Sequence, residues 1–113
     1  MSASHSTAAW QRTRLAILHR DLFTCQMCDT ILTGGRHNPR AAVVDHLMPE
    51  ALRPDLFLDD SNLRSVCKAC HDGPCASIEA RHEGDADAIR AAKLATHRIG
   101  VDGWPIKPNA AHA

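Results

Sequence analysis

Apolar residues recur at helical spacing near the start of the chain, in the segment 10–20, WQRTRLAILHR. Trp10, Ile17 and Leu18 follow the period of an amphipathic helix, and arginines occupy other positions around the turn. A second helix is predicted over residues 85–98, because this segment begins with acidic residues and ends with basic ones, which suits the helix dipole. We therefore expect a helix toward each end of the domain.

The middle of the chain predicts a turn followed by a strand. The segment 33–40, TGGRHNPR, is dense in Gly, Asn and Pro and predicts a hairpin turn. Residues 41–47, AAVVDHL, form a β-branched apolar run that is typical of a strand. Residues 49–60 contain two prolines and predict an irregular crossing. A serine or aspartate at its end is then expected to cap a short helix that begins at NLRSV, residues 62–66.

Length and composition indicate one domain with a thin core. The chain has 113 residues, with two tryptophans, two phenylalanines and no tyrosine. A domain this short buries a small share of its surface, so a covalent or metal constraint would help to stabilise it. We expect a disordered start at 1–8, a folded domain at 9–99, and a Gly- and Pro-rich tail at 100–113. That tail either packs on the domain through Trp104 or is flexible.

Charge and hydropathy restrict the partners and the compartment. Thirteen basic residues balance thirteen acidic ones, so a polyanionic partner has to be held by a local site rather than by a general positive field. There is no long apolar run and no secretory signal pattern, so we expect neither a membrane span nor export. The expected location is the cytoplasm, where reducing conditions favour metal or redox roles for cysteines over disulfides.

Five cysteines follow a pattern that predicts a zinc site. Cys25 and Cys28 form one CxxC pair, and Cys67 and Cys70 form a second. Two residues between thiolates allow the backbone to turn around one ion, and two such knuckles complete a tetrahedral shell of four sulfurs. Buried reduced thiols and a redox CxxC are the alternatives, although a redox site needs only one pair. We expect Cys75 to be a buried or partly exposed thiol without a role.

A second centre is indicated by His71, Asp45 and His46. On a helical turn, neighbouring side chains diverge, so a Cys70 that faces zinc projects His71 away from it. One carboxylate, two imidazoles and open water positions suit a catalytic divalent ion. Neighbours in a regular strand point to opposite faces, so Asp45 and His46 can reach one phosphate only if the strand ends or bulges there.

The motifs, taken together, resemble those of a known family. Cys25 and Cys28, then VVDHLMP (43–49), then DLFLDDSNLRSVCKACHD (55–72) follow one another as in the HNH endonucleases. The resemblance spans roughly residues 14–72 and is greatest to small stand-alone HNH proteins of phages and prophages. It implies an α+β fold, namely a small zinc-stapled ββα-metal (HNH, or His-Me finger) domain with flanking helices.

The resemblance also implies a divalent-metal-dependent DNA endonuclease that hydrolyses phosphodiester bonds. His46 would be the general base, for which the unperturbed pKa of histidine is suited. Asn62 would orient the His46 loop, and Asp45 and His71 would hold the catalytic ion, which is Mg²⁺, Mn²⁺, Ni²⁺ or Zn²⁺. The four CxxC cysteines would hold a structural Zn²⁺.

The implied partners follow from the same resemblance. DNA is the substrate, and a single active site would nick one strand, with double-strand cleavage by a dimer. The protein would be a monomer or a weak homodimer. Relatives that are encoded beside DNA-packaging genes suggest a phage terminase as a further partner.

This chain also departs from the family pattern. A basic residue is common shortly after CHD, where this chain has Gly73-Pro74, which also precedes the last predicted helix. Arg40, Arg64 and Lys68 are the candidate phosphate contacts. Two other hypotheses remain open at this point. One is a zinc ribbon that binds nucleic acid or protein without cutting, and the other is a thiol redox protein.

Overall fold

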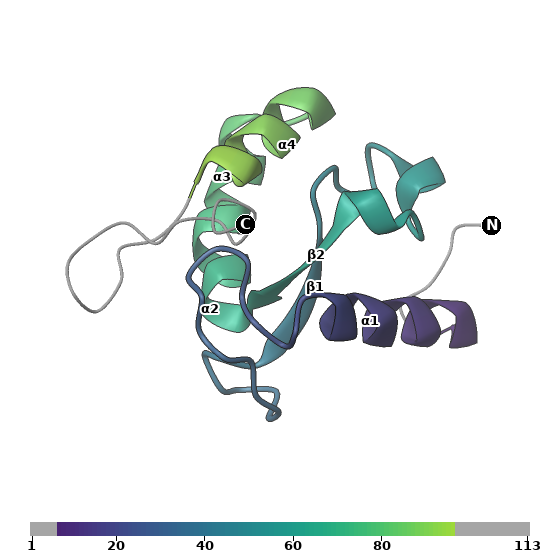
Figure 1. Cartoon of the computed structure of the whole chain (residues 1–113). Coiled ribbons are helices and arrows are strands. Elements are labelled where there is room, and N and C mark those ends of the chain that lie inside the picture. Colours follow the sequence, from purple (N-terminus) through teal and green to yellow (C-terminus); the bar gives the residue numbers. More distant parts are fainter. Residues whose placement is uncertain (1–6, 97–113) are drawn as a thin grey trace.

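The computed structural model describes residues 7–96, which form a two-stranded sheet framed by helices (Figure 1). The predicted α+β class is confirmed. The elements in chain order are helix α1 (Ala8–Arg20), strand β1 (Ala42–His46), 3₁₀ turns at Pro54–Leu56 and Asp60–Asn62, strand β2 (Leu63–Cys67), helix α2 (Lys68–Cys70), a π-helical turn (His71–Cys75), and helices α3 (Ala76–Arg81) and α4 (Ala86–Ala95). No helix among residues 7–96 is both long and apolar enough to cross a membrane.

Helix α1 begins earlier than its apolar pattern suggested. The Thr7 side chain caps it by accepting a hydrogen bond of 3.1 Å from the Trp10 amide, so Ala8 already belongs to the first turn. Trp10, Ile17 and Leu18 are buried, as the helical spacing predicted. The disorder expected at 1–8 therefore does not hold for Thr7 and Ala8, and residues 1–6 lie outside the described residues. The expected packing of Trp104 also lies outside them.

The C-terminal end of α1 is tied to the outer edge of β2. Arg20 Nη2 donates to the Leu63 carbonyl at 2.7 Å, and the Ser65 amide donates to Asp21 Oδ2 at 2.8 Å. These backbone groups lie on the side of β2 that does not pair with β1. The helix therefore satisfies polar groups that an edge strand would otherwise leave open.

The two strands pair in antiparallel register, with Val43 opposite Val66 and His46 opposite Leu63. The helix predicted to begin at Asn62 is wrong, because the segment from Leu63 forms β2. All five residues of this strand are buried, so pairing with β1 and burial outweigh the local capping signal. The capping aspartate, Asp59, closes only a 3₁₀ turn.

The second half of the domain is helical, and it is helical even across Pro74. Helix α2 starts after Cys67, and the chain remains helical through Pro74 up to Arg81. Proline lacks the amide that an α-helical turn requires, and its ring crowds the preceding turn, so the helix widens there into a π turn. Gly84, with φ of +81°, then reverses the chain into α4. Helix α4 ends at Ala95, inside the predicted segment 85–98.

The core is thin and rich in sulfur. Trp10, Phe57 and Val66 are buried against one another and against several aliphatic side chains. Cys25, Cys67, Cys70 and Cys75 belong to the same buried cluster. A core with so few large side chains depends on whatever holds these cysteines together.

Candidate active site and metal centre

Four cysteine sulfurs from separate parts of the chain meet inside the domain. The Sγ atoms of Cys25 and Cys70 are 3.8 Å apart, and those of Cys28 and Cys67 are also 3.8 Å apart. All four ligand atoms lie within 4.8 Å of one another. This spacing is too long for disulfides. It fits the edge of a tetrahedron whose bonds from zinc to sulfur are about 2.3 Å, for which geometry gives an S–S separation of about 3.8 Å.

The backbone around the sulfurs favours thiolates. The Met27 amide donates to Cys25 Sγ, and the Cys70 amide donates to Cys67 Sγ, both at 3.4 Å. The hydrogen bond with the Cys70 thiol lowers the pKa of Cys25 to about 5, whereas burial raises the pKa of Cys28 to about 12. Four adjacent thiols, three of them buried, cannot all ionise together unless a cation compensates their charge. The cluster therefore has the donor set and the electrostatic need of a metal site.

Cys75 belongs to the buried core but not to this group of four sulfurs, as expected. Its sulfur is buried 3.5 Å from Met27 Sδ and 3.8 Å from Asp45 Oδ2. Burial raises the pKa of the Cys75 thiol to about 12, so the group is neutral and packs as a small apolar side chain.

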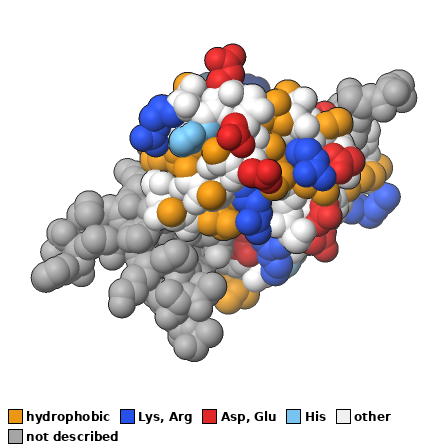
Figure 2. Space-filling model, turned by 90° about the horizontal axis from the view of Figure 1, so that it is seen from above, with side chains coloured by type: hydrophobic (Ala, Val, Ile, Leu, Met, Phe, Trp, Pro, Cys, Tyr) orange, Lys and Arg blue, Asp and Glu red, His pale blue; other side chains and the backbone are white. Residues whose placement is uncertain are grey.

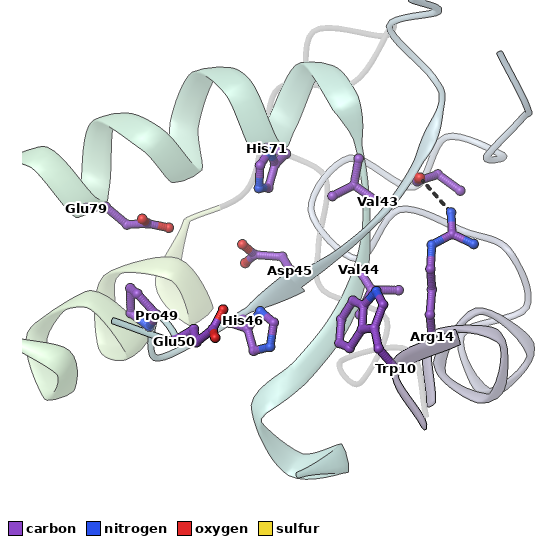
Figure 3. A pocket seen from close by; sticks show the side chains of 11 residues that line it. Trp10, Arg14, Val43, Val44, Asp45, His46, Pro49, Glu50, His71 and Glu79 are labelled. Atoms are coloured by element: carbon purple, nitrogen blue, oxygen red, sulfur yellow. Dashed lines mark hydrogen bonds between the residues drawn. The ribbon is translucent and has the colours of Figure 1, made fainter. Parts of the chain in front are cut away.

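A cavity of about 450 Å³ opens beside β1, and it is lined by Asp45, His46 and His71. Figure 3 shows the His71 imidazole and the Asp45 carboxylate pointing toward the same space from two different elements. His71 follows Cys70 directly, and the helical turn directs the imidazole into this cavity while the thiol faces the other cysteines. The structure therefore brings together the three residues that were predicted to form a second centre.

Asp45 and His46, the last two residues of β1, both line the cavity. The Leu47 amide makes a further bond to the Asn62 carbonyl at 2.8 Å, after which the chain turns away. The Asp45 side chain is 2% exposed and His46 is 9% exposed, so both reach the cavity from its floor. The strand was predicted over 41–47, and β1 ends one residue earlier, at His46. That this end lets the pair reach one phosphate stays a prediction.

The His46 imidazole is held in a defined orientation. Its ring stacks on Trp10, with centroids 5.4 Å apart, and on Phe57, with centroids 5.0 Å apart. Nε2 lies 3.0 Å from the Phe57 carbonyl oxygen. A carbonyl only accepts hydrogen bonds, so Nε2 carries the proton and the basic lone pair of the neutral ring is on Nδ1.

Asn62 fixes the loop that follows His46. Its Oδ1 accepts a hydrogen bond of 2.9 Å from the Met48 amide, and its Nδ2 donates to the Met48 carbonyl at 3.0 Å. The asparagine is buried, so these two bonds are shielded from water. Asn62 thus contacts the loop that the family resemblance led us to expect it to orient.

Comparison with known proteins agrees with this geometry. A family model described as HNH endonuclease matches residues 25–73. The crystal structure of the HNH endonuclease of the deep-sea thermophilic bacteriophage GVE2, with manganese ion, is 32% identical, with a TM-score of 0.56, and the match covers 69% of this chain and 80% of that one. The chain belongs to the HNH endonuclease family. No curated protein sequence matches it.

Membership in this family makes the protein a metal-dependent nuclease of the phosphodiester hydrolase class. The comparisons also confirm the predicted HNH fold, in which the sheet and the following helix frame the cavity. The redox hypothesis for the CxxC pairs loses its support, because all four thiols converge on one point.

Of the three residues predicted to contact DNA in this HNH endonuclease, Arg64 is buried inside the domain. It is only 7% exposed, its Nε lies 3.6 Å from Asp45 Oδ2, and its Nη1 donates to the Lys93 carbonyl at 3.3 Å. A guanidinium buried in this way faces the interior rather than a phosphate. Arg40 is exposed, and Lys68 is partly exposed in an ion pair with Asp72.

Lys93 is a site residue that sequence reasoning missed. It is 0% exposed, and its Nζ lies 3.2 Å from Asp45 Oδ1. A signal was present in the sequence, since Lys93 follows the apolar Ile89 by four residues and so lies on the same face of α4. The family pattern gave no such signal, because the matched span ends at residue 73.

We predict that Asn62→Ala loosens the loop after His46. The substitution leaves the amide and carbonyl of Met48 without the asparagine, so the free energy of unfolding should fall by about 1–3 kcal/mol. The Met48 amide should exchange with deuterium faster than in the parent protein. Asn38→Ala, which alters a turn elsewhere, is the control. An unchanged exchange rate at Met48 in Asn62→Ala would show that the loop is held by other contacts.

Proposed function

We propose that this HNH endonuclease hydrolyses DNA phosphodiester bonds with His46 as general base and with a divalent ion held by Asp45 and His71. The observation that carries the proposal is that these three side chains line one cavity, with the basic nitrogen of His46 selected by its bond to Phe57. The manganese in the related phage enzyme supports a divalent ion of this kind.

The residues present fit such an ion. A carboxylate and an imidazole supply two donors, and the cavity leaves room for water and phosphate oxygens, which Mg²⁺ and Mn²⁺ commonly retain as ligands. A divalent ion bound there would polarise the scissile phosphate and stabilise the leaving oxygen. Ni²⁺ and Zn²⁺ are compatible with the same donors.

The chemical step is carried by His46. A water molecule gives its proton to Nδ1 as its oxygen bonds to phosphorus, and the bond from phosphorus to the leaving oxygen breaks. The leaving oxygen takes a proton from solvent, and the products carry a 5′-phosphate and a 3′-hydroxyl. Trp10 and Phe57 keep the imidazole in the plane from which Nδ1 can accept that proton.

The DNA path that we propose runs beside the cavity. A second hollow of about 680 Å³ shares Arg14 and His71 with the first, and Arg36 and Lys68 line it as well. On the face shown in Figure 2, acidic and basic side chains are interspersed rather than gathered in one basic patch. DNA would therefore be held by individual basic side chains along this hollow, and by Arg40, which is near them in sequence, rather than by a general positive field.

We further propose that the four clustered cysteines bind Zn²⁺ and that this ion is structural. Their sulfurs leave no open position for water, which separates this centre from a catalytic one.

The wider role is proposed from the likeness to a bacteriophage enzyme. One active site per chain supports nicking of a single strand, and double-strand cleavage would need a second copy. Action on phage DNA in the cytoplasm, with a terminase as partner, is the setting that this likeness favours.

The catalytic assignment predicts that His46→Ala abolishes nicking. With Mg²⁺, Mn²⁺ or Ni²⁺, the rate of conversion of supercoiled plasmid to open circles should fall by about 100-fold or more, because general base catalysis is lost. His37→Ala, at an exposed histidine outside the cavity, should retain the parent rate. If His46→Ala cuts as fast as the parent protein, His46 is not the general base. A parent protein that leaves plasmid intact with every metal would leave the non-catalytic zinc ribbon as the better hypothesis.

The zinc assignment predicts one zinc per purified chain by elemental mass spectrometry. Cys70→Ser should lose the zinc and most of the helical circular dichroism, because the thin core depends on the cluster. Cys75→Ala should keep the zinc, since its sulfur lies outside the four-sulfur group. A folded parent protein that contains no zinc would contradict the assignment.

The DNA path predicts that Arg36→Ala combined with Arg40→Ala raises KM for DNA while kcat changes little. The slope of log affinity against log salt should become shallower by about one for each phosphate that the variant no longer neutralises. Arg81→Ala, at an exposed position that lines neither hollow, is the control. Binding that is equal in the double variant and the parent at every salt concentration would rule out this path.

A further inference from the structure

Lys93 carries a positive charge in a fully buried position beside the proposed catalytic residues. Its Nζ donates to Asp45 Oδ1 at 3.2 Å, to the His46 carbonyl at 2.7 Å and to Glu79 Oε2 at 2.7 Å. An ammonium group has three donors, and these three oxygens use them all. A buried charge is costly unless it is paired and hydrogen-bonded, so this full set of partners makes the position tenable.

Two of the three partners belong to the site itself. Asp45 is the proposed metal ligand, and His46 is the proposed base. The third, Glu79, lies on α3 and also lines the cavity (Figure 3). Lys93 thus joins α4 and α3 to the end of β1 through one nitrogen atom.

The bond to His46 is made where the sheet offers no partner. In an antiparallel pair, only every second residue of a strand hydrogen-bonds to the partner strand. The Leu47 amide bonds to the Asn62 carbonyl, so Leu47 belongs to the bonded set and His46, its neighbour, does not. The His46 carbonyl therefore points away from β2, toward the open edge of the sheet. Lys93 occupies that edge and holds the residue at which the strand ends.

The sign of the charge excludes a simple role in attracting the metal. An ammonium 3.2 Å from Asp45 Oδ1 repels a divalent cation at that carboxylate, and the guanidinium of Arg64 adds to the repulsion from the other side. Holding the carboxylate in a fixed direction is a role that the same contacts do support.

We propose that Lys93 is a positioning residue of this nuclease, which fixes the Asp45 carboxylate and the His46 backbone so that metal ligand and base address the same phosphate. The inference rests on the proposed function of Asp45 and His46. It assigns to α4, which lies beyond the family-matched span, a part in the reaction.

The test compares Lys93→Met with the parent chain in Mn²⁺-dependent plasmid nicking, together with Mn²⁺ affinity measured by electron paramagnetic resonance. We expect kcat to fall by about 100-fold, because small displacements of reacting groups have effects of this size. KM for DNA should stay the same, and Mn²⁺ should bind as tightly or more tightly, since a neighbouring positive charge is gone. Arg90→Met, which removes an exposed cation from the same helix, should match the parent in all three.

Lys93→Arg separates position from charge. It retains the positive charge, but its wider planar group cannot place one nitrogen against the same three oxygens. We expect a folded, zinc-containing protein whose kcat falls by about tenfold or more. A kcat equal to the parent value in either variant would overturn the proposal. Loss of zinc and helical structure in both variants would also overturn it, by assigning Lys93 to folding alone.

These outcomes are distinct from failure of the proposed function. If the parent chain binds Mn²⁺ but nicks no plasmid, the nuclease chemistry of His46 fails. If the parent nicks and Lys93→Met nicks equally fast, only the positioning role fails.

Discussion

The convergence of four cysteine sulfurs within 4.8 Å is the constraint on which the rest of the domain depends. It joins the loop after α1 to the end of β2 and the short helix α2 that follows it, two regions that are distant in the chain. The other core residues include few large side chains, so these contacts replace much of the packing that a larger domain would have. His71 follows one of the four cysteines directly, and its direction is therefore fixed by the same convergence.

A second constraint acts around Asp45, near the end of β1. Asp45 lies between Lys93 and Arg64, and Lys93 also holds Glu79. Two buried cations and two carboxylates thus form a balanced network next to the cavity. The sulfur centre positions one side of the proposed active site, and this ionic network positions the other. Asp45 belongs both to this network and to the proposed active site, together with His46 and His71.

The residues that carry short-range motifs could be predicted from the sequence. The CxxC spacing identified the sulfur centre, and the order of Asp45, His46, Asn62 and His71 identified the cavity and the loop contact. Each depends on residues that are close in the chain or that follow a family pattern. The strand itself was predicted over 41–47 from its β-branched apolar run, and β1 occupies Ala42–His46.

The features that were missed depend on contacts between distant segments. Asn62 and the residues after it suggested a helix, yet Leu63 begins a strand because β1 is available for pairing. The sequence predicted no helix for residues 73–84, yet residues 68–81 are helical, with Pro74 inside a π turn. Arg64 and Lys93 are charged residues that usually lie in water, and only the folded chain shows that they face Asp45.

The contact between His46 and the Phe57 carbonyl has a consequence for how this nuclease tolerates change. Rotating the imidazole by half a turn keeps it flat against both aromatic neighbours but puts a ring carbon where each nitrogen was, so stacking alone does not distinguish the two placements. A main-chain oxygen makes that choice, and every amino acid at position 57 would bring the same oxygen. The nitrogen that faces this oxygen, and with it the nitrogen left for the proposed base, is thus set by the path of the main chain rather than by a replaceable side chain.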